Sequence, residues 1–141
     1  MKRTANAQWK GTIKEGKGVM KLGSGAFEGN YSFASRFENG KGTNPEELIG
    51  AAHAGCFSMA LSLFLGDAGF PPDEINTTAE VSIEPKGDGF AITSVALSTK
   101  AKVPGIDEQT FLKHAEAAKE GCPVSQALGG TTITLDATLI S

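Results

Sequence analysis

The stretch TNPEELIGAAHAGCFSMALSLFLG, residues 43–66, decides the fold. It opens with a strong helix start, because Asn44 is a favourable N-cap, Pro45 suits the first helical position and Glu47 follows the cap by three residues. From Pro45 to about Gly66 the side chains are small or apolar on almost every side. We therefore predict one long helix here, and a helix without a polar face has to be central to the fold.

The segments before this helix predict three strands. Residues Ala7 to Met20 alternate loosely around the glycine-bearing turn 15–18, which is typical of a hairpin. The run Tyr31–Phe37 places its aromatic side chains on one face and Arg36 on the other, which predicts a third strand.

The residues after the helix predict a second hairpin, two helices and a last strand. The turn Pro85–Gly89 separates the two strands of this hairpin. Asp107 is suited to cap one helix, and Pro123 is suited to the first position of the next. The predicted ranges are strands over 76–84 and 90–102, helices over 107–120 and 122–128, and a strand over 131–139.

The order of these elements, β-β-β-α-β-β-α-α-β, lacks strict β-α-β alternation. This favours an α+β fold in which a largely antiparallel sheet surrounds the central helix. We expect residues 1–141 to form a single domain, since there is no linker or repeat. A monomer cannot easily cover a helix that is apolar all round, so we also expect a homodimer in which two such helices bury each other.

Composition excludes several classes of protein. The 141 residues are 40% hydrophobic and 21% charged, as in ordinary globular proteins. A net charge of -3 with scattered lysines gives no footprint for nucleic acid. We expect no membrane insertion, because no apolar run looks long enough, and a cytoplasmic location, because the start lacks the apolar core of a signal peptide.

Two cysteines are the main candidates for chemistry. Cys122 begins a predicted helix, where the helix dipole favours a thiolate, whereas Cys56 lies among apolar residues that would raise its pKa. This reasoning alone selects Cys122 as the nucleophile. A cation near Cys56 would reverse the order; Arg36 is a possible source, and Glu46 could hold its guanidinium in a bidentate pair.

Each of these residues also has an ordinary interpretation. A buried free cysteine is usually a small hydrophobe, Glu46 could complement the helix dipole, and Arg36 could be a surface charge. A metal site is a further alternative with little support, because no ligand pair has matched spacing. Its possible ligands would be His53, Cys56, His114 and Cys122.

Three stretches together resemble the osmotically inducible protein C (OsmC) family, relatives of the organic hydroperoxide resistance (Ohr) proteins. They are Gln8–Gly11, Gly42–Leu61 and Gly121–Ser125, and the last two each contain one of the cysteines. The resemblance spans nearly the whole chain and is closest to the OsmC branch. It implies an OsmC-like intertwined homodimer, in which sheets wrap two central helices and the active sites lie at the subunit interface.

The resemblance also implies roles for four residues. Cys56 is similar to the family's peroxidatic cysteine and Cys122 to its resolving cysteine, while Arg36 and Glu46 match the pair that activates Cys56. This reverses the order that the helix dipole favours. The implied activity is reduction of organic hydroperoxides, and less well of hydrogen peroxide, with an external dithiol of the lipoyl or small-thiol type. No metal, flavin or haem cofactor is expected.

Two other interpretations remain open. The apolar dimer interface could hold a small molecule or lipid without turning it over, in which case the thiols are passive. Alternatively, Cys56 and Cys122 could form a structural disulfide, and loss of either would then unfold the domain.

Overall fold

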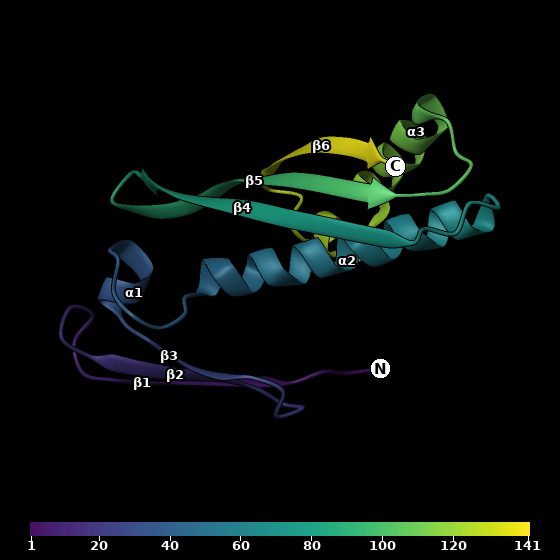
Figure 1. Ribbon diagram of the computed structural model, residues 1–141. Helices are drawn as coiled ribbons and strands as arrows, with labels where there is room; N and C mark the ends of the chain where they lie inside the picture. The colour runs from purple at the N-terminus through teal and green to yellow at the C-terminus, as the bar shows by residue number, and fades with distance from the viewer. The chain divides into compact units, whose positions relative to one another are not determined.

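The computed structural model describes residues 1–141, which form two compact units, Met1–Leu48 and Ile49–Ser141. Its elements follow the predicted order with one helix added near the N-terminus (Figure 1). They are β1 (Ala5–Lys10), β2 (Lys17–Leu22), β3 (Glu28–Tyr31), α1 (Phe33–Phe37), α2 (Pro45–Asp67), β4 (Glu74–Lys86), β5 (Gly89–Lys102), α3 (Glu108–Gly121), α4 (Pro123–Ala127) and β6 (Thr132–Ile140).

The first unit contains a three-stranded antiparallel sheet in the order β1-β2-β3. The predicted N-terminal hairpin is confirmed, although its turn comes earlier than expected, between Lys10 and Lys17. Gly11 in this turn has a φ of 96°, a backbone conformation that glycine adopts without strain. The rings of Trp9 and Tyr31 pack with centroids 5.3 Å apart and join β1 to β3 across β2.

The prediction of a strand over Tyr31–Phe37 is wrong, because β3 ends at Tyr31 and helix α1 follows. Ser32 and Ser35 cause the change through a capping box. The Ser35 backbone N–H donates to Ser32 Oγ at 3.1 Å, and the Ser32 N–H donates to Ser35 Oγ at 2.9 Å. These two bonds satisfy donors that would otherwise be unpaired at a helix start, so the chain turns into a helix despite its alternating aromatic pattern.

Helix α2 begins as predicted and extends over 23 residues. Asn44 Oδ1 accepts a hydrogen bond from the Glu47 backbone N–H at 2.8 Å, and the Asn44 amide donates to the Glu47 carboxylate at 3.0 Å. By length and composition the helix is apolar enough to cross a membrane, with a mean hydropathy of 1.7. The expectation that no apolar run is long enough was therefore wrong in that respect, although core helices of soluble proteins pass the same test.

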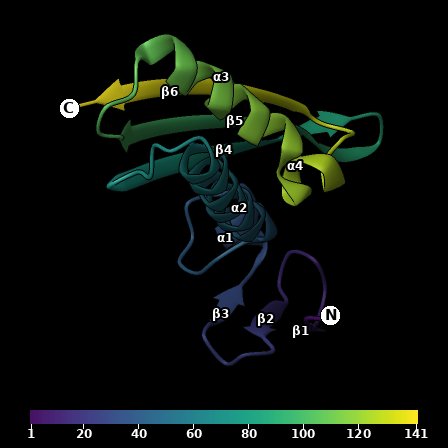
Figure 2. The ribbon, with the colours of Figure 1, turned by 90° about the vertical axis from the view of Figure 1, so that its right-hand side faces the viewer.

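The second unit is built on the sheet β4-β5-β6, in which β4 and β5 pair antiparallel and β5 and β6 pair parallel. The predicted second hairpin is confirmed, with a two-residue turn at Gly87 and Asp88. Alternate β5 residues such as Val95 and Leu97 are buried on one face of the sheet. Helix α2 lies against this sheet and is seen nearly end-on in Figure 2.

The core of this unit joins three elements. It contains Phe57, Leu61 and Leu65, which follow one another at intervals of four along α2. The remaining buried apolar side chains come from β5 and its end and from α3: Val95, Leu97, Ala101, Val103, Phe111, Ala115 and Ala118. On α3 the buried residues Phe111, Ala115 and Ala118 face this core, whereas His114 is only half-buried.

Replacement of Leu61 by alanine tests this core. Leu61 is fully buried, so we expect Leu61→Ala to lower the free energy of unfolding by about 2–5 kcal/mol through lost burial and a cavity. The matched control is Leu112→Ala on α3, where the side chain is 43% exposed and the loss should stay below about 1 kcal/mol. Urea unfolding of both variants measures the difference, and equal losses would contradict the described packing.

Candidate active site

Both cysteines are free thiols in the second unit, and the structure brings them together. Cys56 lies in the middle of α2, and Cys122 lies at the junction of α3 and α4. The Cys122 side chain lies close enough to the Cys56 thiol to raise its pKa, although the two residues are 66 positions apart (122 − 56) in the sequence. Two thiols in contact are placed to exchange oxidation states with each other.

Local sequence explains the position of Cys122. Gly121 ends α3, Pro123 takes the first position of α4, and Cys122 between them is the N-cap of α4. Its sulfur accepts a hydrogen bond from the Ser125 backbone N–H at 3.3 Å. The predicted second helix start is therefore confirmed, and its cap is the cysteine sulfur itself.

The two thiols differ in access to solvent. Cys122 is fully buried, whereas Cys56 is only partly buried. A substrate that arrives from solvent meets Cys56 first. Access therefore opposes the argument from the helix dipole, which favoured Cys122 as the nucleophile.

The surroundings of Cys56 within its own unit do not activate it. Burial raises the pKa of the Cys56 thiol, and the hydrogen bond and charge of Cys122 raise it further. A hydrogen bond from the Val124 backbone N–H to the sulfur lowers this pKa but does not offset the rise. A thiolate at Cys56 thus needs a positive charge from elsewhere.

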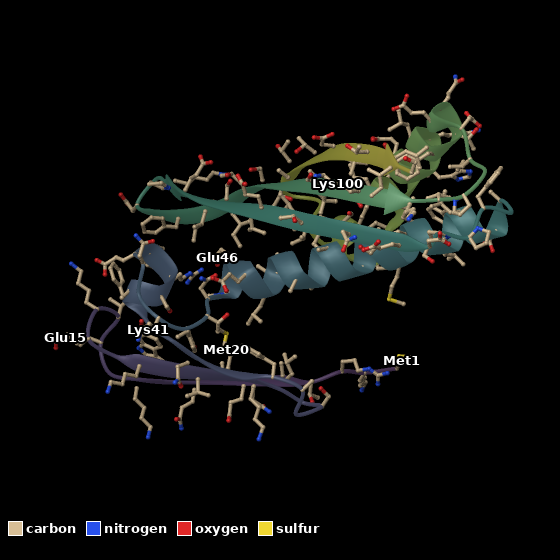
Figure 3. The ribbon with its side chains drawn as sticks, in the orientation of Figure 1. Met1, Glu15, Met20, Lys41, Glu46 and Lys100 are labelled. Carbon is tan, nitrogen blue, oxygen red and sulfur yellow. The ribbon has the colours of Figure 1, made fainter.

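A bidentate ion pair of the kind expected is present in the first unit. Arg36 Nε lies 2.8 Å from Glu46 Oε1, and a terminal guanidinium nitrogen lies 3.1 Å from Oε2. Figure 3 shows Glu46 at the start of α2. Arg36 comes from α1 rather than from a strand, and its carboxylate partner is buried.

The ion pair borders an aromatic hollow. Arg36 and six neighbouring residues from the strands, their connections and α1 line a cavity of about 210 Å³. The guanidinium carbon lies 5.3 Å from the centre of the Phe37 ring, a favourable distance for a cation above an aromatic face. The other lining residues that matter here are Trp9, Ile13, Tyr31 and Phe33. A guanidinium beside apolar surface suits a ligand with one polar and one apolar end.

His53 is the functional candidate that sequence reasoning gave the least weight. It is fully buried, and its Nε2 lies 2.6 Å from Ser125 Oγ. The Ser125 hydroxyl also accepts from the Cys122 thiol at 3.2 Å, so His53 connects to the thiol pair through one side chain. In the sequence, only the spacing of three between His53 and Cys56 indicates a link to the thiols. Nothing in the sequence indicates that His53 contacts Ser125, which is 72 positions away.

The alternative metal site has no support in the geometry. No group of three or more His, Cys, Asp and Glu side chains is arranged to hold a metal ion. His114, one of the four possible ligands, is a half-buried residue of α3.

Two neighbouring free thiols, one on a helix that packs against a sheet and one at the start of another helix, define a thiol-redox class of protein, and comparisons identify the family. The family model "OsmC-like protein" matches residues 38–136. The chain is 56% identical to the peroxiredoxin OsmC of Escherichia coli (strain K12) over 135 residues, covering 95% of this chain and 94% of the relative. The chain therefore belongs to the OsmC family.

More distant relatives agree. The chain is 32% identical to an organic hydroperoxide resistance protein of Xanthomonas axonopodis pv. citri over 100 residues, which covers 68% of each chain. Among solved structures, an organic hydroperoxide resistance protein from Elizabethkingia anophelis superposes with a TM-score of 0.70 at 27% identity, over 96% of this chain and 94% of that one. The expected OsmC-like α+β fold is confirmed.

The difference in burial between the thiols is testable by alkylation. We expect a short pulse of N-ethylmaleimide to modify Cys56 about tenfold or more faster than Cys122, because a fully buried side chain reacts only after local opening. Peptide mass analysis of the reduced protein gives both rates. Cys56→Ser is the control, in which Cys122 should keep its slow rate, and faster labelling of Cys122 in the wild type would contradict the described burial.

Proposed function

We propose that this OsmC-family protein is a cysteine-based peroxidase that reduces organic hydroperoxides to alcohols, with Cys56 as the attacking residue and Cys122 as the resolving one. The observation that carries this proposal is a pair of contacting free thiols, of which one is accessible and the other buried. The names of the relatives, peroxiredoxin and organic hydroperoxide resistance protein, support the same activity. The protein would serve as an antioxidant in the cytoplasm, with residues 1–141 as one domain.

The first step oxidises Cys56. Its thiolate attacks one peroxide oxygen, an S–O bond forms as the O–O bond breaks, and the alkoxide leaves and takes up a proton as the alcohol. Cys56 becomes a sulfenic acid, the first and reversible stage of thiol oxidation. The apolar hollow beside Arg36 favours an organic hydroperoxide over hydrogen peroxide.

The second step links the two cysteines. The sulfur of Cys122 attacks the sulfenic sulfur of Cys56, an S–S bond forms, and the hydroxyl leaves as water. The contact between the two side chains supports this step, since little movement is needed. An external dithiol, of the lipoyl type or a small thiol, then reopens the disulfide by exchange.

Activation of Cys56 is assigned to Arg36, which Glu46 holds in direction. A guanidinium near the sulfur lowers the pKa that burial raises. Glu46 and Cys56 are ten residues apart on α2, roughly 15 Å along the helix at 1.5 Å per residue. We therefore assign the arginine to the partner subunit of a homodimer.

The exposed face of α2 supports this dimer. Met59 and Leu63 are 76% and 58% exposed on a helix whose opposite face is buried in the core. Exposed apolar side chains aligned along one face are typical of an interface. Two copies of α2 that meet on this face would bury them, as the family resemblance implies.

Variants of the two cysteines test the assigned roles. With cumene hydroperoxide and a dithiol, we expect wild-type protein to turn over and to form an internal disulfide. Cys56→Ser should lose activity, and Cys122→Ser should stop with Cys56 as a sulfenic or higher acid, because nothing resolves it. Peroxide consumption and intact mass measure both.

Other outcomes would reassign the site. An inactive Cys122→Ser variant that leaves Cys56 unoxidised would reverse the two roles. Absence of peroxide consumption by any protein would instead favour the ligand-binding module with passive thiols, and unfolding of both variants would favour a structural disulfide.

Mixing two inactive variants tests whether the arginine crosses the interface. We expect Arg36→Met and Cys56→Ser to be inactive alone. After unfolding and refolding together, mixed dimers contain one site with both Cys56 and Arg36 if the arginine comes from the partner. Activity should then return to about a quarter of wild type, because half of the dimers are mixed and each has one site. No recovery, with a dimeric native mass, would place both residues in one subunit.

A further inference from the structure

His53 is a buried ionisable group that the proposed peroxide cycle does not use. It is fully buried on α2, and burial lowers the pKa of its imidazole, which keeps the ring neutral at neutral pH. Its Nδ1 has no hydrogen-bond partner, whereas Nε2 makes a short contact of 2.6 Å with Ser125 Oγ. Burying a histidine with only one of its two ring nitrogens hydrogen-bonded destabilises the fold, so packing alone does not explain this residue.

Ser125 connects this imidazole to the thiol pair. Its hydroxyl oxygen lies 2.6 Å from His53 Nε2 and 3.2 Å from Cys122 Sγ. The Cys122 thiol donates to this oxygen, which leaves the serine O–H to donate to Nε2. Nδ1 then carries the ring proton. The donors are thus aligned in one direction, from the Cys122 thiol through Ser125 to His53.

We propose that His53, acting through Ser125, accepts the proton of the Cys122 thiol while the disulfide forms. This inference rests on the proposed function, because it concerns the resolving step of that cycle. Its geometry is independent of how Cys56 is activated, since all three side chains belong to the second unit.

The resolving step begins with two proton transfers. As the Cys122 S–H proton passes to Ser125, the serine proton passes to Nε2, which gives a Cys122 thiolate and a His53 imidazolium. The thiolate attacks the Cys56 sulfenic sulfur, the S–S bond forms and the S–O bond breaks. Hydroxide leaves and takes up the proton that His53 returns, which yields water. The Cys122 sulfur is oxidised, the Cys56 sulfur is reduced, and His53 is restored.

The need for a base follows from the contacts of Cys122. Its sulfur meets the Ser125 backbone and hydroxyl and the Cys56 thiol, none of which carries a positive charge. A base that takes up the proton as the S–S bond forms therefore accelerates this step, typically by about 100-fold or more.

The other ionisable groups around this cluster are few. The Cys122 thiol belongs to the relay and the Cys56 thiol lies beside it, and the β4 and β5 side chains packed on α2 are apolar or hydroxyl groups. Helix α3 contributes half-buried His114 and the Lys119–Glu116 pair, in which Glu116 is exposed. His53 is the fully buried imidazole of the two in the chain.

The test separates the two chemical steps in a single turnover. Fully reduced protein is mixed with one equivalent of cumene hydroperoxide and quenched at intervals, and mass analysis with a sulfenic-acid trap gives both rates. Measurements run from about pH 5 to about pH 9, which brackets the ordinary pKa values of histidine and cysteine. The variants are His53→Gln, which hydrogen-bonds but takes up no proton, Ser125→Ala, and the matched control Ser125→Thr, which keeps the hydroxyl.

In the wild type we expect disulfide formation to be nearly constant around neutrality and to fall only at acid pH. Burial lowers the pKa of His53, so the base form persists below the ordinary value of about 6.5. In His53→Gln and Ser125→Ala disulfide formation should be about 100-fold slower at pH 7 because the relay is lost, and its rate should rise with pH because hydroxide then removes the proton. Ser125→Thr should keep the wild-type profile.

Several results would overturn the relay. One is a wild-type dependence of disulfide formation on pH in His53→Gln, and another is the same dependence in Ser125→Ala and Ser125→Thr. Thermal unfolding shows whether His53→Gln folds, and if it does not, the comparison of the two serine variants tests the relay. If wild-type protein forms no sulfenic acid at Cys56, the proposed function is wrong and the relay falls with it. Normal sulfenic acid formation with an unaltered second step in the variants overturns the relay alone.

Discussion

The burial of α2 against the sheet β4-β5-β6 is the constraint on which the rest of the structure depends. Phe57, Leu61 and Leu65 fix which face of this helix enters the core. Because Cys56 precedes Phe57 by one position, its direction is rotated by about 100° from the centre of that face. The thiol therefore lies at the edge of the core, partly buried, and reaches both Cys122 and solvent.

Partial burial of Cys56 has two opposite effects on its reactivity. Burial raises the pKa of the Cys56 thiol and disfavours the reactive form, yet a drier environment strengthens the attraction between a thiolate and a nearby cation. Two hydrogen bonds to Glu46 hold the Arg36 guanidinium in one orientation, so little side-chain entropy is lost when it meets a thiolate. In the proposed assignment, a reactive thiolate forms only where the arginine of a partner subunit docks, so activation would depend on assembly.

Features set by neighbouring residues could be predicted from the sequence. Asn44 with Pro45 and Cys122 with Pro123 mark helix starts that the structure confirms, because a cap and its bonded N–H groups lie within three residues. The exception is α1. Its Ser32–Ser35 capping box is also local, but the aromatic alternation around it resembles a strand, and the hydrogen bonds prevail over the pattern.

The candidate site was less accessible to sequence reasoning. Contacts such as that of His53 with Ser125 join residues 72 apart, and only the fold decides that they meet. Resemblance selected Cys56, Cys122, Arg36 and Glu46, but no local pattern distinguishes an imidazole packed for volume from one that faces a reacting thiol. In the fold the distinction is clear, because burial leaves His53 one hydrogen-bond partner, and that partner contacts the sulfur of Cys122. A neutral imidazole in this position loses stability at the unpartnered Nδ1 and presents the lone pair of Nε2 to Ser125 as a proton acceptor.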